Sequence, residues 1–246
     1  MSGDRNNEYD SFAWFYHKFW EGWPSKILPI LDQQFFPLMT QGGRILDLCC
    51  GTGAVARHFV ERGYAVVGVD GSEAMLEYAR LAVPSATFIC SDARNFKVNQ
   101  LCDGAVSLYD SLNHIMTLEG LTSAFACTRK ALKPGAVFFF DMNDDASFAA
   151  HWRGSQGMAD DESAVVAKGS YDADSKHGKL ALTMFRFSDN RWERTNLVLE
   201  QHAFSAEEIN SALDVAGFGH VRIFNTYRDF GWGAPGRLVM TCRARG

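Results

Sequence analysis

The sequence predicts an α/β fold built around a doubly wound, mostly parallel β-sheet. Up to about Asp141, short apolar segments alternate with segments of helical periodicity. These apolar segments lack the in-and-out alternation of a half-exposed strand, which indicates parallel strands covered on both faces. Right-handed crossovers between such strands place helices on both sides of the sheet. Beyond Asp141 strands follow one another directly, which predicts a small antiparallel β insertion.

The first part of the chain contains the predicted parallel strands and their helices. Strands are expected at residues 44–49, 64–70, 86–90, 103–109 and 136–141. Helices are expected at residues 53–62, 72–82 and 119–132, followed by Gly63, by Pro84 and by Lys133-Pro134-Gly135. Glycine just after a helix and proline shortly beyond it are common termination signals.

Three segments with strand periodicity follow without an intervening helix, at residues 163–170, 178–187 and 192–203. We expect them to pair antiparallel, because parallel strands need a long crossover. Ser205 then opens a helix, with Glu208 completing a capping box and Gly217 as its stop. Two last strands are expected at 219–226 and 236–243. Residues 1–246 are therefore predicted as one domain, with an antiparallel insertion or substrate cap at 144–203 and a helical lid at 1–38.

Composition argues against several classes of function. With 24 basic and 29 acidic residues the formal net charge is −5, so no broad cationic surface is available for a nucleic acid. The N-terminus is polar and no apolar run approaches the roughly 18 to 20 residues that span a bilayer, so we expect no membrane anchor. The six cysteines lack the paired spacing of a zinc site, which predicts reduced thiols, no bound metal and a cytoplasmic protein.

A cofactor site is predicted where the first two strands end. Residues 45–53 read as a buried strand that contains Asp47 and runs into a turn with Gly51 and Gly53, and Asp70 closes the next strand. Residues 51–56 also satisfy a loose dinucleotide-binding pattern. A carboxylate near a pyrophosphate would be repulsive, however. Asp47 therefore favours a cationic cofactor that contains a nucleoside.

Groups that could hold the nucleoside follow the second and third strands. Asp70 precedes Gly71 and Ser72, which places hydrogen-bond acceptors where two ribose hydroxyls would bind. Asp92 and Ala93 follow the third strand, where a carboxylate can accept from an exocyclic adenine amine. If Asp47, Gly51, Gly53 and Asp70 were only turn residues, all four would have to occur at these spacings by chance.

These segments carry a family resemblance. Residues 45–56, together with 66–70, 90–93 and 103–115, resemble class I S-adenosylmethionine-dependent methyltransferases. The resemblance covers essentially the whole chain and implies a Rossmann-like fold with a seven-stranded sheet. The sequence departs from the family at Cys49, where many members carry the first glycine of the turn. The implied cofactor is S-adenosylmethionine, and its implied binding residues are Tyr16, Asp47, Cys49, Gly51, Gly53, Asp70, Gly71, Ser72, Met75, Asp92, Ala93, Leu108 and Tyr109.

Within this family the chain is similar to small-molecule enzymes such as amino-sugar N,N-dimethyltransferases. The aromatic segment 9–20, the insertion and the entry into the last helix at 204–208 carry the likeness. The resemblance implies that Tyr9 and Tyr16 reach the methionine end of the cofactor and that His114 faces a small-molecule acceptor. A histidine suits removal of a proton near neutral pH. Tyr9 and His114 are therefore the predicted catalytic residues.

Other interpretations stay open. His114 could instead cap or pack against a helical turn, and the aromatic N-terminal segment has the spacing of a packed lid. The leading function is methyl transfer to a nitrogen or oxygen of a small molecule. The alternatives are a noncatalytic cofactor-binding regulatory protein and an NAD-dependent oxidoreductase. The sequence has no readable code for the acceptor and leaves open whether the chain forms a homodimer.

Overall fold

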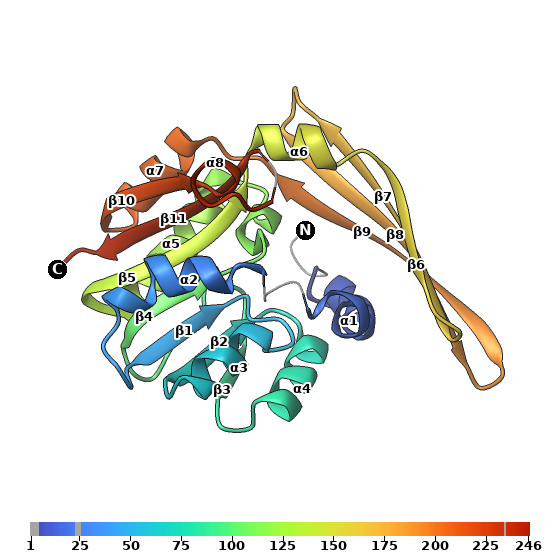
Figure 1. The fold of residues 1–246 in the computed structure, drawn as a ribbon, viewed down its shortest axis with the longest axis horizontal. Coiled ribbons are helices and arrows are strands. Elements are labelled where there is room, and N and C mark those ends of the chain that lie inside the picture. Colours follow the sequence, from blue (N-terminus) through green and yellow to red (C-terminus); the bar gives the residue numbers. More distant parts are fainter. Residues whose placement is uncertain (1–4, 23–25, 234) are drawn as a thin grey trace.

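A central seven-stranded sheet organises the computed structural model, which describes residues 5–22, 26–233 and 235–246 (Figure 1). Its strand order is β10-β11-β5-β4-β1-β2-β3, and β11 runs antiparallel between β5 and β10. The other neighbours pair in parallel. The predicted doubly wound, mostly parallel sheet is thus confirmed. The strands are β1 Arg44–Leu48, β2 Ala65–Asp70, β3 Thr87–Cys90, β4 Cys102–Ser107, β5 Leu132–Asn143, β10 Phe218–Asn225 and β11 Arg237–Ala244.

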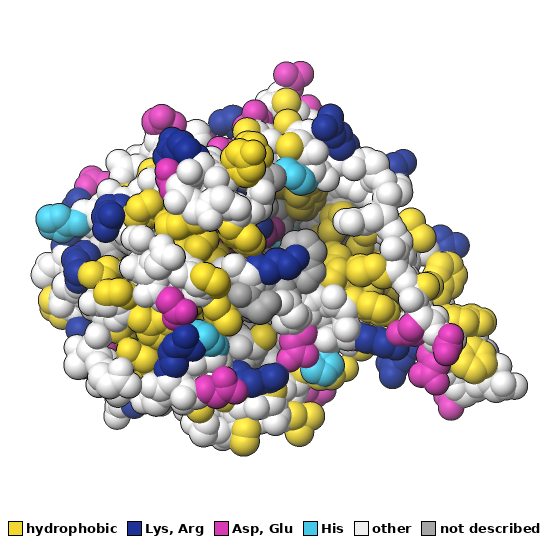
Figure 2. All heavy atoms as spheres, in the orientation of Figure 1, with side chains coloured by type: hydrophobic (Ala, Val, Ile, Leu, Met, Phe, Trp, Pro, Cys, Tyr) yellow, Lys and Arg dark blue, Asp and Glu magenta, His cyan; other side chains and the backbone are white. Residues whose placement is uncertain are grey.

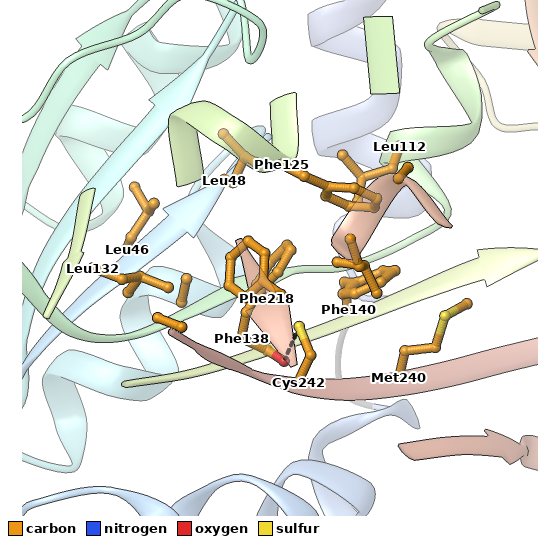
Figure 3. Close-up of a cluster of buried hydrophobic side chains, with 14 of the residues drawn as sticks. Leu46, Leu48, Leu112, Phe125, Leu132, Phe138, Phe140, Phe218, Met240 and Cys242 are labelled. Atoms are coloured by element: carbon orange, nitrogen blue, oxygen red, sulfur yellow. Dashed lines mark hydrogen bonds between the residues drawn. The ribbon is translucent and has the colours of Figure 1, made fainter. Parts of the chain in front are cut away.

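Helices cover both faces of this sheet. On one face, α5 (Leu118–Ala131) and α7 (Ala206–Val215) bury apolar side chains against the strands, and Phe138 and Phe140 lie at the centre of that cluster (Figure 3). On the other face lie α2 (Leu28–Gln34) and α3 (Ala54–Glu61), with Phe35 and Phe59 fully buried. Helix α4 (Glu73–Ala82) packs against β3 and β2, next to Cys50 in the turn after β1. Because both faces are covered, the inner strands can be apolar along their length.

Hydrogen bonds at helix starts follow the sequence signals. Ser205 accepts from the N–H of Glu208, and the Glu208 side chain accepts from the N–H of Ser205, so the predicted capping box is present. Ser72 caps α4 in the simpler way, by accepting from the N–H of Met75. Such caps satisfy backbone donors that have no partner inside the helix and contribute about 1 kcal/mol each.

A second, four-stranded antiparallel sheet projects from the body of the molecule (Figure 1). It contains β6 (Gly154–Ala159), β7 (Ser163–Asp172), β8 (His177–Ser188) and β9 (Arg191–His202). Asp189 and Asn190 adopt positive φ angles between β8 and β9, as a two-residue hairpin turn requires. The sequence predicted three of these strands. It missed β6, in which two glycines leave no apolar alternation, and the preceding α6 (Asp145–His151), which is only seven residues long.

The N-terminal segment forms helices, in agreement with the predicted helical character of its described residues. Helix α1 (Arg5–Phe15) continues into a π-helix, η1 (Tyr16–Trp20), and a short η3 (Phe36–Leu38) follows α2. Phe12 and Phe15 are buried between the projecting sheet and α4. The remainder of the predicted lid, residues 1–4 and 23–25, lies outside the described residues.

Two short helices lie outside the segments that the sequence predicted to be helical. The aromatic loop near residues 230–233 is preceded by α8 (Thr226–Phe230), which Asn225 caps by accepting from the N–H of Arg228. A 3-10 helix, η4 (Ser111–His114), follows β4. In the described part of the chain, no helix has the length and apolar character needed to cross a membrane.

Candidate active site

The turn after β1 brings backbone atoms to the surface of the cofactor pocket. Gly51 and Gly53 have φ angles of +52° and +82°, in the left-handed region that glycine adopts without strain. A Cβ on Gly53 would lie 3.1 Å from the Cβ of Ala79 in α4, so glycine also permits the turn and helix to approach. Cys49 has φ of +58° without being glycine. The family's usual glycine at that position thus corresponds to a real conformational requirement here.

Asp70 connects this turn to the start of α4. Its Oδ2 accepts from the N–H of Gly51 at 2.9 Å, and its Oδ1 accepts from the N–H of Ser72 at 2.9 Å. Burial raises the pKa of Asp70, and the hydrogen bonds from Ser72 and Gly51 oppose that shift. From α1, Asp10 accepts from the hydroxyl of Ser72 at 2.6 Å and from the N–H of Ala74 at 3.2 Å. The N-terminal helix is therefore bonded to the cofactor side of α4.

A pocket lies between this turn, the end of β4 and the N-terminal helix. Its lining includes five of the predicted cofactor residues, namely Tyr16, Asp47, Cys49, Leu108 and Tyr109. The other residues that line it are Cys50, Thr52, Ala54, Val55 and Ser111.

The remaining predicted cofactor residues are not part of this pocket's lining. Gly51, Gly53, Asp70, Gly71 and Ser72 form the adjoining backbone turns. Met75 is buried beneath the start of α4, packed in the cluster that includes α1 and the projecting sheet. Asp92 lies just after β3, next to Ala93, and both of its carboxylate oxygens bind the guanidinium of Arg94.

Asp47 has the environment of a site for a cationic group. It is 2 % exposed, and its Oδ2 has no hydrogen-bond partner among the described residues. Burial first, and the carboxylate of Asp70 second, raise its pKa to about 8. An unpartnered buried carboxyl oxygen beside a second carboxylate favours a ligand that brings positive charge. The residues therefore fit S-adenosylmethionine, whose methionine end carries an ammonium group and a sulfonium.

The two predicted catalytic residues meet, although 105 positions separate them in the sequence. The hydroxyl of Tyr9 lies 2.9 Å from Nε2 of His114, and the two rings pack edge to face. Nδ1 of His114 lies 2.9 Å from the carbonyl oxygen of Glu200 in β9. Burial, followed by the charges of Asp70 and Asp110, raises the pKa of Tyr9 well above its usual value. The pair thus lies near the carboxylates of the cofactor turn.

A buried charged cluster beside the pocket was missed in the sequence. Arg237 on β11 forms ion pairs with Asp141 at the end of β5, at 2.5 Å, and with Asp110 after β4, at 3.0 Å. Asp141 also accepts from the N–H groups of Tyr109 and Asp110. Both of those residues have positive φ. An acidic residue at the end of an apolar strand was the signal for Asp47 and Asp70, and it applies equally to Asp141. Arg237 carried no comparable signal.

Comparison with known proteins identifies the activity class of this chain. Residues 45–135, which include the turn after β1, Asp70 and His114, match the methyltransferase domain family. The chain is an S-adenosylmethionine-dependent methyltransferase.

Sequence relatives of this methyltransferase agree in activity class. It is 28% identical over 196 residues to the putative methyltransferase YqeM of Bacillus subtilis, covering 78% of this chain and 79% of the relative. It is 34% identical over 97 residues to the dTDP-3-amino-3,4,6-trideoxy-alpha-D-glucopyranose N,N-dimethyltransferase of Streptomyces venezuelae. That match covers 39% of this chain and 41% of the relative. The NAD-dependent alternative is not supported by these relatives.

Solved structures show the same fold as this methyltransferase. An S-adenosylmethionine-dependent methyltransferase from Clostridium acetobutylicum superposes with a TM-score of 0.78 at 21% identity, covering 97% of this chain and 99% of the other. DesVI of Streptomyces venezuelae superposes with a TM-score of 0.76 at 23% identity, covering 99% and 100%. Because the overlap extends over nearly all of each chain, it includes the projecting sheet. The predicted Rossmann-like methyltransferase fold is confirmed.

Proposed function

We propose that this methyltransferase transfers a methyl group to the nitrogen of a small-molecule amine. The observation that carries this proposal is the contact between Tyr9 and His114, near the acidic side chains of Asp70 and Asp110 and beside a pocket that Asp47 lines. Burial raises the pKa of Tyr16 most, and the charges of Asp110, Asp70 and Asp47 raise it further. An environment that opposes ionisation of a phenol favours a bound cation, as an ammonium-bearing acceptor would be. Among the relatives, the Streptomyces venezuelae enzyme named above is an N,N-dimethyltransferase.

Oxygen methylation is the second candidate. Ubiquinone biosynthesis O-methyltransferase of Hahella chejuensis is 33% identical over 103 residues, covering 40% of this chain and 42% of the relative. Matches of this length to both N- and O-methyltransferases support S-adenosylmethionine as the methyl donor. They do not distinguish nitrogen from oxygen as the acceptor atom. The carboxylates around the pocket therefore weigh more heavily, and they favour nitrogen.

Residues of the pocket have distinct roles in holding the cofactor. We propose that Asp70 accepts from the ribose hydroxyls, since a carboxylate has about four acceptor positions and the backbone N–H groups of Gly51 and Ser72 occupy two of them. Asp47 receives the ammonium group, and Asp92 accepts from the adenine amine while it pairs with Arg94. Gly51 and Gly53 allow the backbone to approach the ligand closely.

When bound, S-adenosylmethionine supplies a methyl group on an activated sulfonium leaving group. An acceptor that binds as an ammonium must first lose a proton, so that the nitrogen lone pair can form a bond to the methyl carbon as the bond from carbon to sulfur breaks. Tyr9 and His114 are proposed to hold the acceptor and take that proton, because the hydroxyl and the imidazole nitrogen already share a hydrogen bond. Orientation of acceptor and donor by the pocket supplies most of the rate enhancement.

The projecting sheet and the N-terminal helix are proposed to shape the acceptor site. Figure 2 shows a hollow between the body of the molecule and this sheet, with hydrophobic side chains on its wall. On the inner side of the sheet, Leu182, Met184, Leu197 and Leu199 are buried against α1. The six cysteines are all free, which supports a reducing, cytoplasmic environment for the reaction.

A panel of matched amines and alcohols tests this proposal. Transfer of label from methyl-labelled S-adenosylmethionine should occur to amines and not to alcohols of the same carbon skeleton. Tyr9→Phe and His114→Asn should each lower turnover by roughly 100-fold, the usual size of a lost acid-base contribution, and leave affinity for S-adenosylhomocysteine unchanged. His58→Asn, at a half-buried histidine of α3 that does not line the pocket, is the matched control and should retain turnover.

Two results would contradict the assignment. Transfer to alcohols alone would show that oxygen is the acceptor atom. Tight binding of S-adenosylhomocysteine without transfer to any acceptor of the panel would favour the noncatalytic regulatory alternative.

A further inference from the structure

The pair of Tyr9 and His114 is the end of a longer chain of polar side chains. Gln201 on β9 is 3 % exposed, and its Nε2 lies 2.8 Å from Nε2 of His114. The same Nε2 lies 2.8 Å from Oδ2 of Asp110. Oδ1 of Asp110 is 3.0 Å from the guanidinium of Arg237, which also pairs with the fully buried Asp141. Side chains from five parts of the chain are therefore connected in series, and two of them, Tyr9 and Gln201, contact the same imidazole nitrogen.

The chemistry of these groups determines which of them donate. A carboxylate can only accept, so the atom of Gln201 that faces Asp110 must be the amide nitrogen. That nitrogen carries two hydrogens, and the second faces Nε2 of His114. The carbonyl oxygen of Glu200 can likewise only accept, so Nδ1 of His114 carries a hydrogen. Both constraints describe the same neutral tautomer, with the proton on Nδ1 and a lone pair on Nε2.

We propose that Gln201 is a positioning residue that, held by Asp110, donates to Nε2 of His114 and keeps this nitrogen an unprotonated acceptor facing Tyr9. Its part in methyl transfer rests on the function proposed above, whereas the hydrogen-bond arrangement does not. The single lone pair of Nε2 is then shared by two donors, the amide of Gln201 and the hydroxyl of Tyr9. The lone pairs of the phenol oxygen then remain available to accept an N–H of the acceptor.

Arg237 and Asp141 keep Asp110 in place for this role. Tyr109 and Asp110 adopt successive positive φ angles, a conformation that is unfavourable for residues other than glycine. Their N–H groups donate to Asp141 at 2.7 and 3.2 Å. The guanidinium of Arg237 also lies over the rings of Tyr109 and Trp232. The strained turn is thus secured from β5 and β11, and it presents the Asp110 carboxylate to Gln201.

Nitrogen-15 NMR of the histidine rings tests the proposal on the intact 246-residue chain at pH 8. The unprotonated nitrogen of a neutral imidazole resonates far downfield of the protonated one. We expect His114 to show the downfield signal at Nε2. His58 is an internal control of the opposite kind, because a guanidinium nitrogen of Arg62 donates to its Nδ1 at 2.8 Å. Its downfield signal should therefore belong to Nδ1.

Gln201→Glu reverses the direction of the hydrogen bond. A carboxyl oxygen in place of the donor would accept from the ring, so Nε2 of His114 should become protonated and its downfield signal should be lost. Asn196→Asp makes the same amide-to-acid change on the same strand, on the exposed side of the hairpin, and should leave the His114 signal unchanged. Binding of S-adenosylhomocysteine reports whether each variant is folded.

A protonated Nε2 in the wild-type protein would overturn the proposal, and this measurement stands even if Gln201→Glu does not fold. A downfield Nε2 signal that persists in a folded Gln201→Glu protein would overturn it as well. Neither NMR measurement depends on methyl transfer. An error in the proposed amine acceptor can therefore be distinguished from an error in the proposed hydrogen bonds of Gln201.

Discussion

The carboxylate of Asp70, at the end of β2, accepts a hydrogen bond of 2.9 Å from the N–H of Gly51, in the turn after β1. A residue predicted to hold the cofactor thus also holds the cofactor turn. Its second oxygen accepts from Ser72 at the start of α4, so one side chain orients both backbone segments that face the pocket. Loss of this carboxylate should therefore affect ligand binding in two ways.

We predict that Asp70→Ala weakens binding of S-adenosylhomocysteine by about 10- to 100-fold, the range expected for lost hydrogen bonds to a charged group. Isothermal titration calorimetry measures this change. Asp229→Ala, which removes an exposed carboxylate paired with Arg228, should bind like the wild type. An affinity within twofold of the wild type for Asp70→Ala would show that the ribose assignment is wrong.

The raised pKa of Asp47 predicts a pH-dependent stability. In the unfolded chain its carboxyl has the ordinary pKa of 3.8, and in the folded protein the pKa is about 8. Stability from this group is fully present below the unfolded pKa and is lost as the pH rises through 8. The Asp47→Asn variant has no ionisable group at this position, so it does not lose this stability as the pH rises. The free energy of unfolding of the variant, relative to the wild type, should therefore increase by roughly 2 to 4 kcal/mol between pH 5 and pH 9.

Urea denaturation of both proteins at the two pH values measures the difference. Asp103→Asn is the matched control, because Asp103 has a lowered pKa and is ionised in both the folded and the unfolded state over this range. Its free energy of unfolding, relative to the wild type, should therefore be the same at both pH values. If the free energy of unfolding of Asp47→Asn, relative to the wild type, is also the same at both pH values, Asp47 is ionised in the folded protein. The same substitution should weaken S-adenosylmethionine binding, since the ammonium group would lose its carboxylate.

Arg237→Met tests the buried cluster that supports Asp110. The substitution leaves Asp141, which is completely buried, without its cation. Removing one partner of a buried ion pair typically costs about 3 to 5 kcal/mol of stability. Arg228→Met, at an exposed ion pair, should change stability by less than about 1 kcal/mol.

Chemical denaturation measures both Arg variants, and the double variant Arg237→Met/Asp141→Asn should recover part of the loss because the uncompensated charge is gone. A loss below about 1 kcal/mol in Arg237→Met would mean that water or a neighbouring group compensates Asp141 without the arginine.

Local sequence patterns predicted most of the fold. Each strand of the central sheet was found within a few residues, because buried parallel strands are continuous apolar runs and their helices end at glycine or proline. Strand β5 begins at Leu132, four residues before the predicted start. Strand β6 was missed because its glycines leave no periodicity, and it forms by pairing along β7. Pairing of this kind depends on a neighbour and not on the segment's own composition.

The sequence by itself was enough to predict the cofactor side of this protein, because a glycine turn and the acidic ends of adjacent parallel strands meet at one edge of a sheet once the strand order is known. Only the tertiary structure brings together the residues proposed for the acceptor side. Tyr9, His114 and Gln201 come from α1, from the segment after β4 and from β9 of the insertion. Their hydrogen bonds depend on how the projecting sheet and the N-terminal helix pack against the body. No local spacing encodes such contacts between distant segments.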